Sequence, residues 1–502
     1  MTKPLPGISG FAVYAPPYRV DLQDWCEWTG NDWAKVGSVV GRGFRMRGPD
    51  QNVYTMAANA VLRLIDQYQI DPAKVRFLGL GTESSLDNSA GSVIIKGMLD
   101  RALCSQGRSP LSRNCEVPEF KHACLGSVYA MKNALRFLAC DGKDHQAIVV
   151  SSDTAEYARG STGEPTQGAG AVAMLLEARP KLLEVDLGDS GSSSDYRGVD
   201  FRKPLSRFCH QTLRHNGQLQ DLPVFNGKYS TTCYSDETLH AVRDMFARRG
   251  LAGGQYFRDL AAVFMHRPYH RMPQSAFALT YLFALAHGGL EDRAELRRYC
   301  EAAEVDHGKL VQEMSRSPSL LQLVENDAIG EEVYPLSMAL LRPFRATDAY
   351  QQLVECKMQP GSEAMMELGN LYTGALSGWM AAGCEDAQRQ GLDWSGRELL
   401  TIGYGSGDAA EAIPMRVVTG WEQAAERIAF NASLDNAIDL TQQQYESLHD
   451  HGNAAHLPPL RDQEFVIARV GQRREPDFCD QGIEYYDFIP AREQVRRGTG
   501  TH

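Results

Sequence analysis

One cysteine, Cys124, has the type and the setting that nucleophilic chemistry needs. It lies within EVPEFKHACLGSVYAMKNALRFLA, residues 116–139, where a short extended stretch runs into a long apolar helical pattern. At a helix N-terminus, unpaired backbone N–H groups and the helix dipole favour the attacking thiolate over the thiol. Spacing alone fits a small buried core cysteine equally well, because free cysteine is among the most buried residue types. We predict an ionised Cys124 as the candidate nucleophile.

Two further ionisable residues follow apolar, strand-like runs. Glu83 comes directly after RFLGLGT, where partial removal from water would raise its pKa and suit it to act as a general base. Taken alone, Glu83 fits a loop carboxylate or a helix cap better. His266 ends LAAVFMH and is followed by Arg267, His270 and Arg271. A histidine there can act as an acid or donate to a carbonyl, and the adjoining cations suit a phosphate-bearing ligand.

Two segments of small residues could bring backbone and amide groups close to a substrate. They are GNLYTGALSG (369–378) and GYGSGDAAEA (403–412), and we expect both to be turns that run into helices. Oxyanion contacts require such close approach. Each segment is a weak signal alone, because glycine-rich turns are common and neither matches a nucleotide-binding fingerprint.

The elements that position these residues alternate between strands and helices. Apolar periodicity predicts helices over 53–65 and 125–138, and strands at 76–82, 146–152, 170–176, 260–266 and 399–405. This alternation predicts an α/β fold, in which ligand sites gather at strand ends. We expect irregular structure over 188–235, charged helices over about 290–345, and after residue 420 a tail whose clearest strand is 465–468.

Composition excludes several classes of protein. The 502 residues are 43% hydrophobic and 23% charged, which is ordinary for a globular protein, and the net charge of −12 disfavours nucleic acid as a partner. The 11 cysteines lie far apart with no CxxC pair, so we expect reduced thiols and no metal site. No secretion signal or membrane-spanning stretch is visible, so we expect a soluble, cytoplasmic protein without membrane contact.

The order of these segments resembles the 3-hydroxy-3-methylglutaryl-CoA synthases of the thiolase superfamily. GTE, a helix-leading cysteine, H-x-P-Y, N-x-Y-T and YGSG follow one another, and further matches lie at 152–177, 200–204 and 224–234. The resemblance runs from about residue 10 to about residue 488. It implies a homodimer with a five-layered αβαβα fold made of two similar halves. The implied divisions are an N-terminal half (1–180), a C-terminal half (181–420) with a helical insertion at about 285–345, and an accessory extension (421–502).

The same resemblance implies a role for each site residue. Cys124 matches the acylated nucleophile, Glu83 the base, and His266 the residue that orients and polarises acetoacetyl-CoA. The positions matching substrate-side or supporting contacts are Asn370, Ser406, Tyr372, Asp153, Tyr157, Asp200, Gly405 and Arg271. The family typically has Asn-Ala-Cys followed by Tyr or Phe, where this chain has His122-Ala123-Cys124-Leu125, and Arg271 stands where a lysine is common.

The implied reaction joins acetyl-CoA, through an acetyl-Cys124 enzyme, to acetoacetyl-CoA, giving 3-hydroxy-3-methylglutaryl-CoA and CoA, as in the mevalonate pathway of isoprenoid biosynthesis. The thioesters are substrates, and no cofactor is implied. One alternative is the same chemistry on acetoacetyl groups bound to an acyl carrier protein in polyketide biosynthesis. A second is a decarboxylating or initiating ketoacyl synthase, which needs no carboxylate base. The third is a non-catalytic thiolase-fold protein that binds an acyl ligand.

Overall fold

The structure is a computed structural model that describes residues 5–85, 87–203, 214–215, 218–219, 222–435, 437–458 and 462–490. Pro204 of the 200–204 match and Cys209 lie outside these residues. Ten strands of the described ranges form one sheet, in the order β12-β13-β14-β8-β1-β7-β6-β4-β5, with β9 paired to β14. All the strands predicted from apolar runs lie within it, so those predictions are confirmed.

The N-terminal part of the sheet has a simple pairing pattern. β4 (Val75–Gly81) and β6 (Gln146–Ala155) are parallel, β7 (Gly168–Glu177) is antiparallel to β6, and β1 (Gly7–Tyr14) is antiparallel to β7. The short β5 (Glu119–Phe120) forms the edge beside β4. The helices of this part are α3 (Val53–Gln67), α4 (Gly91–Ser105) and α5 (Gly126–Ala139).

The second part repeats this pattern. β12 (Ala262–Met265) and β13 (Glu398–Gly405) are parallel, and β14 (Ala409–Val417) is antiparallel to β13. β8 (Leu183–Val185) and β9 (Gly191–Ser194) are antiparallel to β14. The main helices here are α6 (Lys228–Arg249), α8 (Arg271–His287) and α15 (Gly374–Gln390). The chain therefore contains two similar βα halves, joined where β8 pairs with both β1 and β14.

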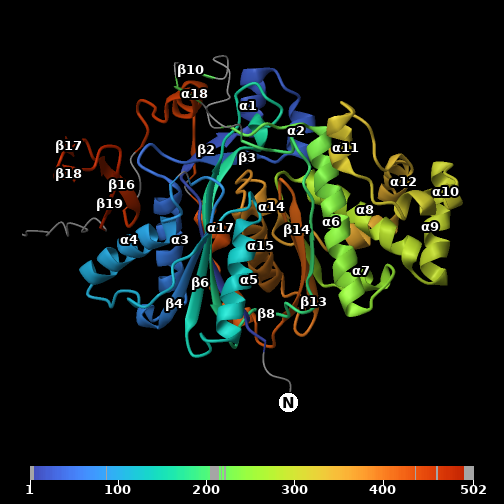
Figure 1. The fold of residues 1–502 in the computed structure, drawn as a ribbon, viewed down its shortest axis with the longest axis horizontal. Coiled ribbons are helices and arrows are strands. Elements are labelled where there is room, and N and C mark those ends of the chain that lie inside the picture. The colour runs from blue at the N-terminus through green and yellow to red at the C-terminus, as the bar shows by residue number, and fades with distance from the viewer. Residues whose placement is uncertain are drawn as a thin grey trace, which may run out of the picture.

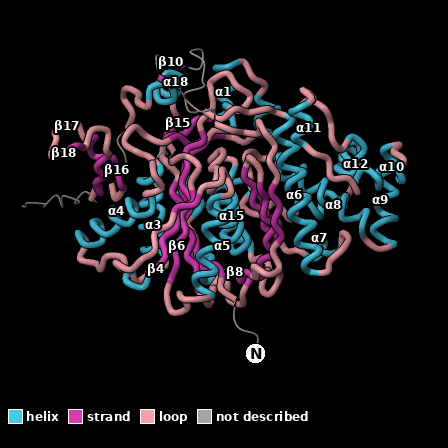
Figure 2. The backbone as a smooth tube through the Cα atoms, viewed as in Figure 1, coloured by secondary structure: helices cyan, strands magenta, loops and turns pink. Residues whose placement is uncertain are grey.

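The two halves are stacked into layers with α5 and α15 in the middle. Figure 1 shows α3 and α4 outside β4 and β6 on one side, and α6 and α8 outside β13 and β14 on the other, and Figure 2 shows the strands as two groups separated by helices. α15 contacts β6 and β7 of one half and β12 and β13 of the other. Nearly all its residues are buried, as expected of a helix covered on every side.

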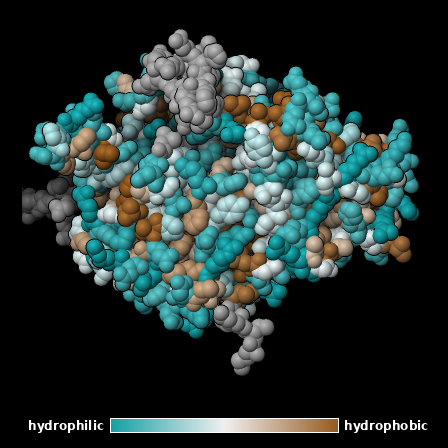
Figure 3. Space-filling view, in the orientation of Figure 1, coloured by the Kyte–Doolittle hydropathy of each residue, from teal (hydrophilic) through white to brown (hydrophobic). Residues whose placement is uncertain are grey.

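A helical excursion lies at one end of the molecule and covers the predicted insertion. It contains α9 (Leu290–Ala303), α10 (His307–Met314), α11 (Leu320–Glu325), α12 (Pro335–Arg345) and α13 (Asp348–Tyr350). Figure 3 shows mostly hydrophilic residues over it. A π-helical turn, Gln351–Glu355, and α14 (Ser362–Met365) lead back to α15.

The remaining elements surround the site end of the sheet and form the tail. They are β2 (Tyr18–Asp21), α1 (Leu22–Thr29), α2 (Trp33–Val39), β3 (Gly43–Met46), β10 (Arg214–His215), β11 (Gln218–Leu219), α7 (Gln255–Asp259), α16 (Glu422–Ala425), α17 (Phe430–Leu434), β15 (Ile438–Asp439), α18 (Gln442–His451), β16 (Phe465–Val470), β17 (Arg474–Glu475), β18 (Phe478–Cys479) and β19 (Glu484–Phe488). β15 joins β2 and β3 in a small sheet. The predicted strand 465–468 is part of β16.

The expectation of irregular structure over 188–235 is wrong at two places. β9 forms from four Gly and Ser residues, which have low strand propensity, because β14 supplies its hydrogen-bond partners. α6 already begins at Lys228. No helix in the described part of the chain is long and apolar enough to cross a membrane. The ten cysteines described are free thiols. The residue boundaries of the halves and the extension stay predictions.

Candidate active site

A cavity of about 420 Å³ opens between the two halves of the molecule. Cys124, from the N-terminal half, and His266, from the C-terminal half, both line it. The predicted residues Tyr157, Asp200, Asn370 and Ser406 are also in its wall. Residues that lie more than 280 positions apart in sequence therefore meet at one site, as Cys124 and Ser406 do.

The nucleophile lies in a tight loop before α5. The backbone at Ala123 is left-handed, with φ of 41°, and α5 begins two residues after Cys124. The end of β13 packs directly on this loop, since a Cβ on Gly405 would lie 2.6 Å from the carbonyl oxygen of His122. Gly405 was predicted as a substrate contact. The structure instead shows that its missing side chain lets β13 approach the nucleophile loop.

Cys124 and Glu83 are in direct contact. The Cys124 thiol donates to Oε2 of Glu83 over 3.4 Å. Burial, and secondly the charge of Asp153, raises the pKa of Glu83 to about 7. A carboxylate with this pKa can take up and release protons near neutral pH, as a general base must.

The prediction that the helix start keeps Cys124 ionised is wrong for this site. Burial raises the pKa of the Cys124 thiol well above its usual range, and the nearby carboxylates of Glu83 and Asp153 add to the shift. Desolvation and two negative neighbours outweigh a helix terminus, whose effect on a charge is typically about 1 kcal/mol. The sulfur is therefore a thiol whose proton has one short route, to Glu83.

Asp153 lies beneath the site, and the cavity lining does not include it. Its Oδ1 accepts hydrogen bonds from the backbone N–H groups of Glu83 (2.7 Å) and Ser84 (3.0 Å). Its Oδ2 accepts the backbone N–H of Thr373 at 3.0 Å, and the Thr373 hydroxyl also donates to it. Asp153 therefore holds the Glu83 turn to the start of α15. Its prediction as a substrate contact is corrected to this supporting position.

His266 presents a neutral imidazole to the cavity. Its backbone oxygen accepts from the Tyr234 hydroxyl at 2.7 Å, and its ring stacks on Tyr404 with centroids 6.2 Å apart. Burial lowers the pKa of His266 to about 3. Of the two roles considered from the sequence, the structure supports a hydrogen-bond donor to a carbonyl, because an imidazolium acid is scarce at neutral pH.

An aromatic group surrounds the nucleophile. Tyr157 and Tyr372 meet edge to face with ring centroids 6.3 Å apart, and Phe201 packs against both. Asn370 orients this group, because its Oδ1 accepts from the Tyr372 backbone at 2.8 Å and its Nδ2 lies 3.4 Å from the Tyr157 hydroxyl. Tyr372 is buried behind the wall, next to Cys124. Phe201 was not predicted, although its position beside Asp200 in the 200–204 match was a signal.

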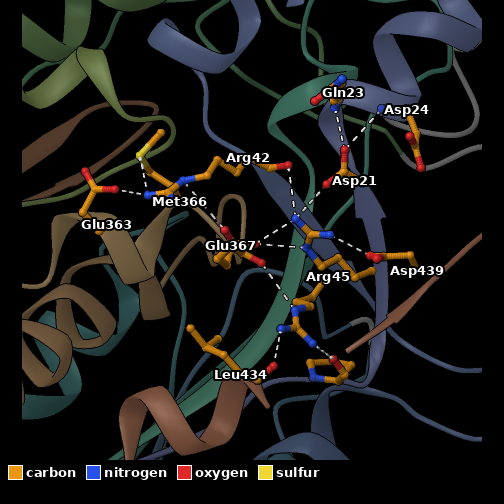
Figure 4. Close-up of polar contacts among 12 residues, drawn as sticks. Asp21, Gln23, Asp24, Arg42, Arg45, Glu363, Met366, Glu367, Leu434 and Asp439 are labelled. Atoms are coloured by element: carbon orange, nitrogen blue, oxygen red, sulfur yellow. Dashed lines mark hydrogen bonds and ion pairs between the residues drawn. The ribbon is translucent and has the colours of Figure 1, made fainter. Parts of the chain in front are cut away.

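The segment before Asn370 is fixed by β3 and its neighbours. The backbone N–H groups of Arg42 and Gly43 donate to Met366 O at 2.9 and 3.0 Å. Figure 4 shows Arg42 between Glu363 and Glu367, with both of which it forms ion pairs. These contacts tie the 363–368 segment, and through it Asn370, to the small sheet.

The 403–412 segment was expected to run into a helix, and this is wrong. It is the turn between β13 and β14, which are antiparallel. Ser406, at its tip, lines the cavity beside Asp200, whose Oδ2 accepts from the Tyr404 hydroxyl at 2.9 Å. The alternation of small and apolar residues in GYGSGDAAEA suits a buried hairpin equally well.

Arg271 does not line the cavity. It is exposed at the start of α8, where its Nε donates to Ser38 O and its Nη1 to Gln274, both at 3.1 Å. The neighbouring residues Val39 and Val40 do line the cavity. The prediction is wrong for the acyl site itself, and Arg271 lies beside the mouth instead.

Comparisons with known proteins agree with one family. Residues 4–180 match the family model described as hydroxymethylglutaryl-coenzyme A synthase N terminal. A hydroxymethylglutaryl-CoA synthase of Haloferax volcanii is 27% identical over 418 residues, covering 83% of this chain and 84% of the relative. A synthase of Enterococcus faecalis is 24% identical and covers 88% and 91%. The structure of MvaS in complex with 3-hydroxy-3-methylglutaryl coenzyme A is similar, with a TM-score of 0.72, 25% identity, and coverage of 96% and 99%.

The chain belongs to the hydroxymethylglutaryl-CoA synthase family. Its fold is accordingly thiolase-like. A curacin-pathway HMG synthase in complex with an acetyl donor carrier protein has the same fold, with a TM-score of 0.67, 19% identity, and coverage of 96% and 100%.

The two departures from the family pattern beside the nucleophile do not change the cavity wall. Leu125 is buried under β13, where its side chain would meet a Cβ on Gly403 at 2.7 Å, and it does not line the cavity. The His122 ring packs edge-on against Tyr129 with centroids 5.8 Å apart, and burial lowers its pKa. In this member of the hydroxymethylglutaryl-CoA synthase family, both changes therefore affect the packing around the nucleophile loop.

Proposed function

We propose that this chain is a hydroxymethylglutaryl-CoA synthase, an acyltransferase that condenses acetyl-CoA with acetoacetyl-CoA. The observation that carries the proposal is the contact between the Cys124 thiol and the Glu83 carboxyl in a cavity shared with His266. A nucleophile, a base and a carbonyl donor are the three groups that the chemistry needs.

In the first step, Cys124 becomes acetylated. Its proton passes to Glu83 over the 3.4 Å contact as the sulfur attacks the acetyl-CoA carbonyl. The carbon–sulfur bond to CoA then breaks, and the CoA thiolate takes up the proton. Ser406, in the wall of the same cavity, is our candidate for a contact to the acyl oxygen.

In the second step, a carbon–carbon bond forms. Glu83 removes a proton from the methyl group of acetyl-Cys124, and the resulting carbanion adds to C3 of acetoacetyl-CoA. The neutral His266 polarises the C3 carbonyl by donating a hydrogen bond, and the C3 alkoxide then takes the proton held by Glu83. Water finally hydrolyses the thioester to Cys124, leaving a carboxylate on 3-hydroxy-3-methylglutaryl-CoA.

The direct test is to incubate the purified protein with both thioesters and to identify the product by mass. We expect 3-hydroxy-3-methylglutaryl-CoA from the native chain and none from Cys124→Ala. Radioactive acetyl-CoA should label the native chain covalently. A labelled Cys124→Ala variant would move the nucleophile elsewhere, and a native chain without label or product would leave an acyl-binding protein without catalysis.

We also propose coenzyme A as the acyl carrier, with no further cofactor or metal. The support is that the relatives aligned over most of this chain are named as CoA synthases. Turnover with acetoacetyl-CoA supports this, whereas turnover only with an acetoacetyl carrier protein contradicts it. A homodimer is a further proposal from the family, which light scattering during gel filtration tests.

A further inference from the structure

A group of buried carboxyls lies directly behind the cavity wall, at the turn that carries Ser406. Asp200, Asp236, Glu237 and Asp408 are at most 3% exposed, and a single guanidinium, that of Arg197, lies among them. Four ionised carboxylates beside one cation would leave three negative charges uncompensated in this described cluster. Burying such charges is costly, so protons or another cation must be present.

Arg197 is committed mainly to α6. Its Nη2 donates to Asp236 at 2.6 Å and also to Glu237, and its Nη1 donates to Cys233 O at 2.9 Å. Its Nε lies 3.7 Å from Oδ2 of Asp408 and has no hydrogen-bond partner among the described residues. Asp408 therefore receives only part of the charge of Arg197.

The hydroxyl of Tyr404 allows a count of protons. It lies 2.9 Å from Oδ2 of Asp200 and 2.9 Å from Oδ1 of Asp408. A phenol has one hydrogen, so it can donate fully to only one of two carboxylates. The second short contact is a hydrogen bond only if one of the carboxyls is itself protonated.

Two carboxyl oxygens of this pair lack a donor. Oδ1 of Asp200 and Oδ2 of Asp408 are buried and have no hydrogen-bond partner in the described part of the chain. Oxygens of the two carboxyls lie within 4.8 Å of each other and of the Cys233 sulfur. A proton held between the carboxyls would supply the missing donor.

We propose that Asp200 and Asp408 share one proton, and that this proton holds the Gly405–Asp408 turn, with Ser406, against the cavity wall. Asp408 is thus a positioning residue, which acts through Asp200 and the turn. The inference rests on the proposed function, because Ser406 is taken there as a substrate contact.

The electrostatics of the turn agree with this geometry. Burial, and secondly the charge of Asp200, raises the pKa of Asp408 to about 8. The other titratable groups that face the pair are Cys233, His240, Asp195, Asp236, Glu237, Arg197 and Tyr404. Cys233 and Tyr404 have raised pKa values and stay neutral, and the pKa of His240 is lowered, so none of these three supplies a charge near pH 8.

The proposal predicts an alkaline limit to substrate binding. Above pH 8 both carboxyls are ionised and repel each other, and the turn loses its anchor. With a pKa of about 8 for Asp408, the protonated fraction falls from about 0.9 at pH 7 to about 0.09 at pH 9. If only the protonated form binds, the apparent KM rises about tenfold over that range, while kcat at saturation changes less.

The test compares Asp408→Asn with the control Asp195→Asn. Asp195 is a neighbour whose side chain is 54% exposed and also lies 3.7 Å from Arg197. An asparagine supplies a permanent N–H donor in place of the shared proton, so Asp408→Asn should have a KM that is flat from pH 7 to pH 9. Asp195→Asn should keep the tenfold rise. A rise in Asp408→Asn equal to that of the native enzyme overturns the proposal.

A second measurement does not depend on turnover. Infrared spectra of the native protein should show the carbonyl band of a protonated carboxylic acid that is lost with a midpoint near pH 8, and Asp408→Asn should lack this component. Persistence of the band in Asp408→Asn, or its absence from the native protein, contradicts the shared proton. A stoichiometric metal ion, bound by the native protein and lost in Asp408→Asn, also overturns it. Failure of the proposed function would abolish product formation and leave the infrared result unchanged.

Discussion

Replacing Glu83 with alanine should stop condensation and leave acetylation of Cys124 intact. Condensation depends on Glu83 as the base that removes the methyl proton, and the loss of a positioned base typically slows such a step by about 10²–10⁴-fold. Acetylation has an opposing gain. The charge of Glu83 is, after burial, the largest cause of the raised pKa of the Cys124 thiol, so its removal makes the thiolate more accessible.

The assay measures both steps on one preparation. Radioactive acetyl-CoA reports the stoichiometry of acetyl-enzyme, and added acetoacetyl-CoA reports release of condensed product. We expect labelling near one acetyl group per chain in Glu83→Ala, with product formation lowered by at least about 100-fold. The matched control is Glu156→Ala, which removes a carboxylate that pairs with Arg47 at 3.6 Å outside this cavity. Near-native product formation by Glu83→Ala would refute the assignment of the base.

The pH dependence of the native enzyme gives the same reasoning a second check. Since the pKa of Glu83 is raised to about 7, the base is ionised above that pH and protonated below it. Its ionised fraction falls from about one half at pH 7 to about one eleventh at pH 6, so condensation should slow about fivefold between them. A limb with a midpoint near pH 4.5, the ordinary range of an exposed carboxyl, would show that Glu83 is not buried in the working enzyme.

Three further changes test other parts of the site. His266→Ala should retain acetylation and raise the KM for acetoacetyl-CoA, and steady-state kinetics above pH 5 should show no limb from His266 in the native enzyme, because its pKa is near 3. Gly405→Ala should abolish labelling of Cys124 while circular dichroism shows a folded protein, because the added Cβ would lie 2.6 Å from His122 O. Arg45→Ala should lower stability to urea by about 3 kcal/mol, since Arg45 is buried and donates three hydrogen bonds to backbone oxygens.

The positions of the reactive residues could be predicted because each one adjoins a strongly patterned element. Glu83 and His266 follow apolar strands, and Cys124 precedes an amphipathic helix, so local periodicity alone places them at element ends. The family resemblance then grouped them. The structure brings Cys124 and Glu83 into contact and gives His266 the same cavity.

The state of those residues could not be predicted from the same patterns. The ionisation of Cys124 depends on Glu83 and Asp153, which come from two other segments of the chain, and on burial by a third. Asp153 is the eighth residue of β6, and only the position of α15 shows that its carboxylate points beneath the site. Arg271 was assigned from charge alone, whereas the direction of α8 turns it towards Ser38.

The repeated pairing of the two halves explains why the site divides its labour. Glu83 follows β4 and His266 follows β12, and these strands hold the same place in their halves, each parallel to the next long strand. The loop before α5 carries Cys124, and the loop before α15 carries Asn370. Equivalent positions thus bear different chemistry, nucleophile and base from one half and carbonyl donor and amide from the other. Because the Thr373 hydroxyl bridges Gly81 O and Asp153 across the junction, the two sets are held in one fixed geometry, which a carbon–carbon bond between two bound thioesters requires.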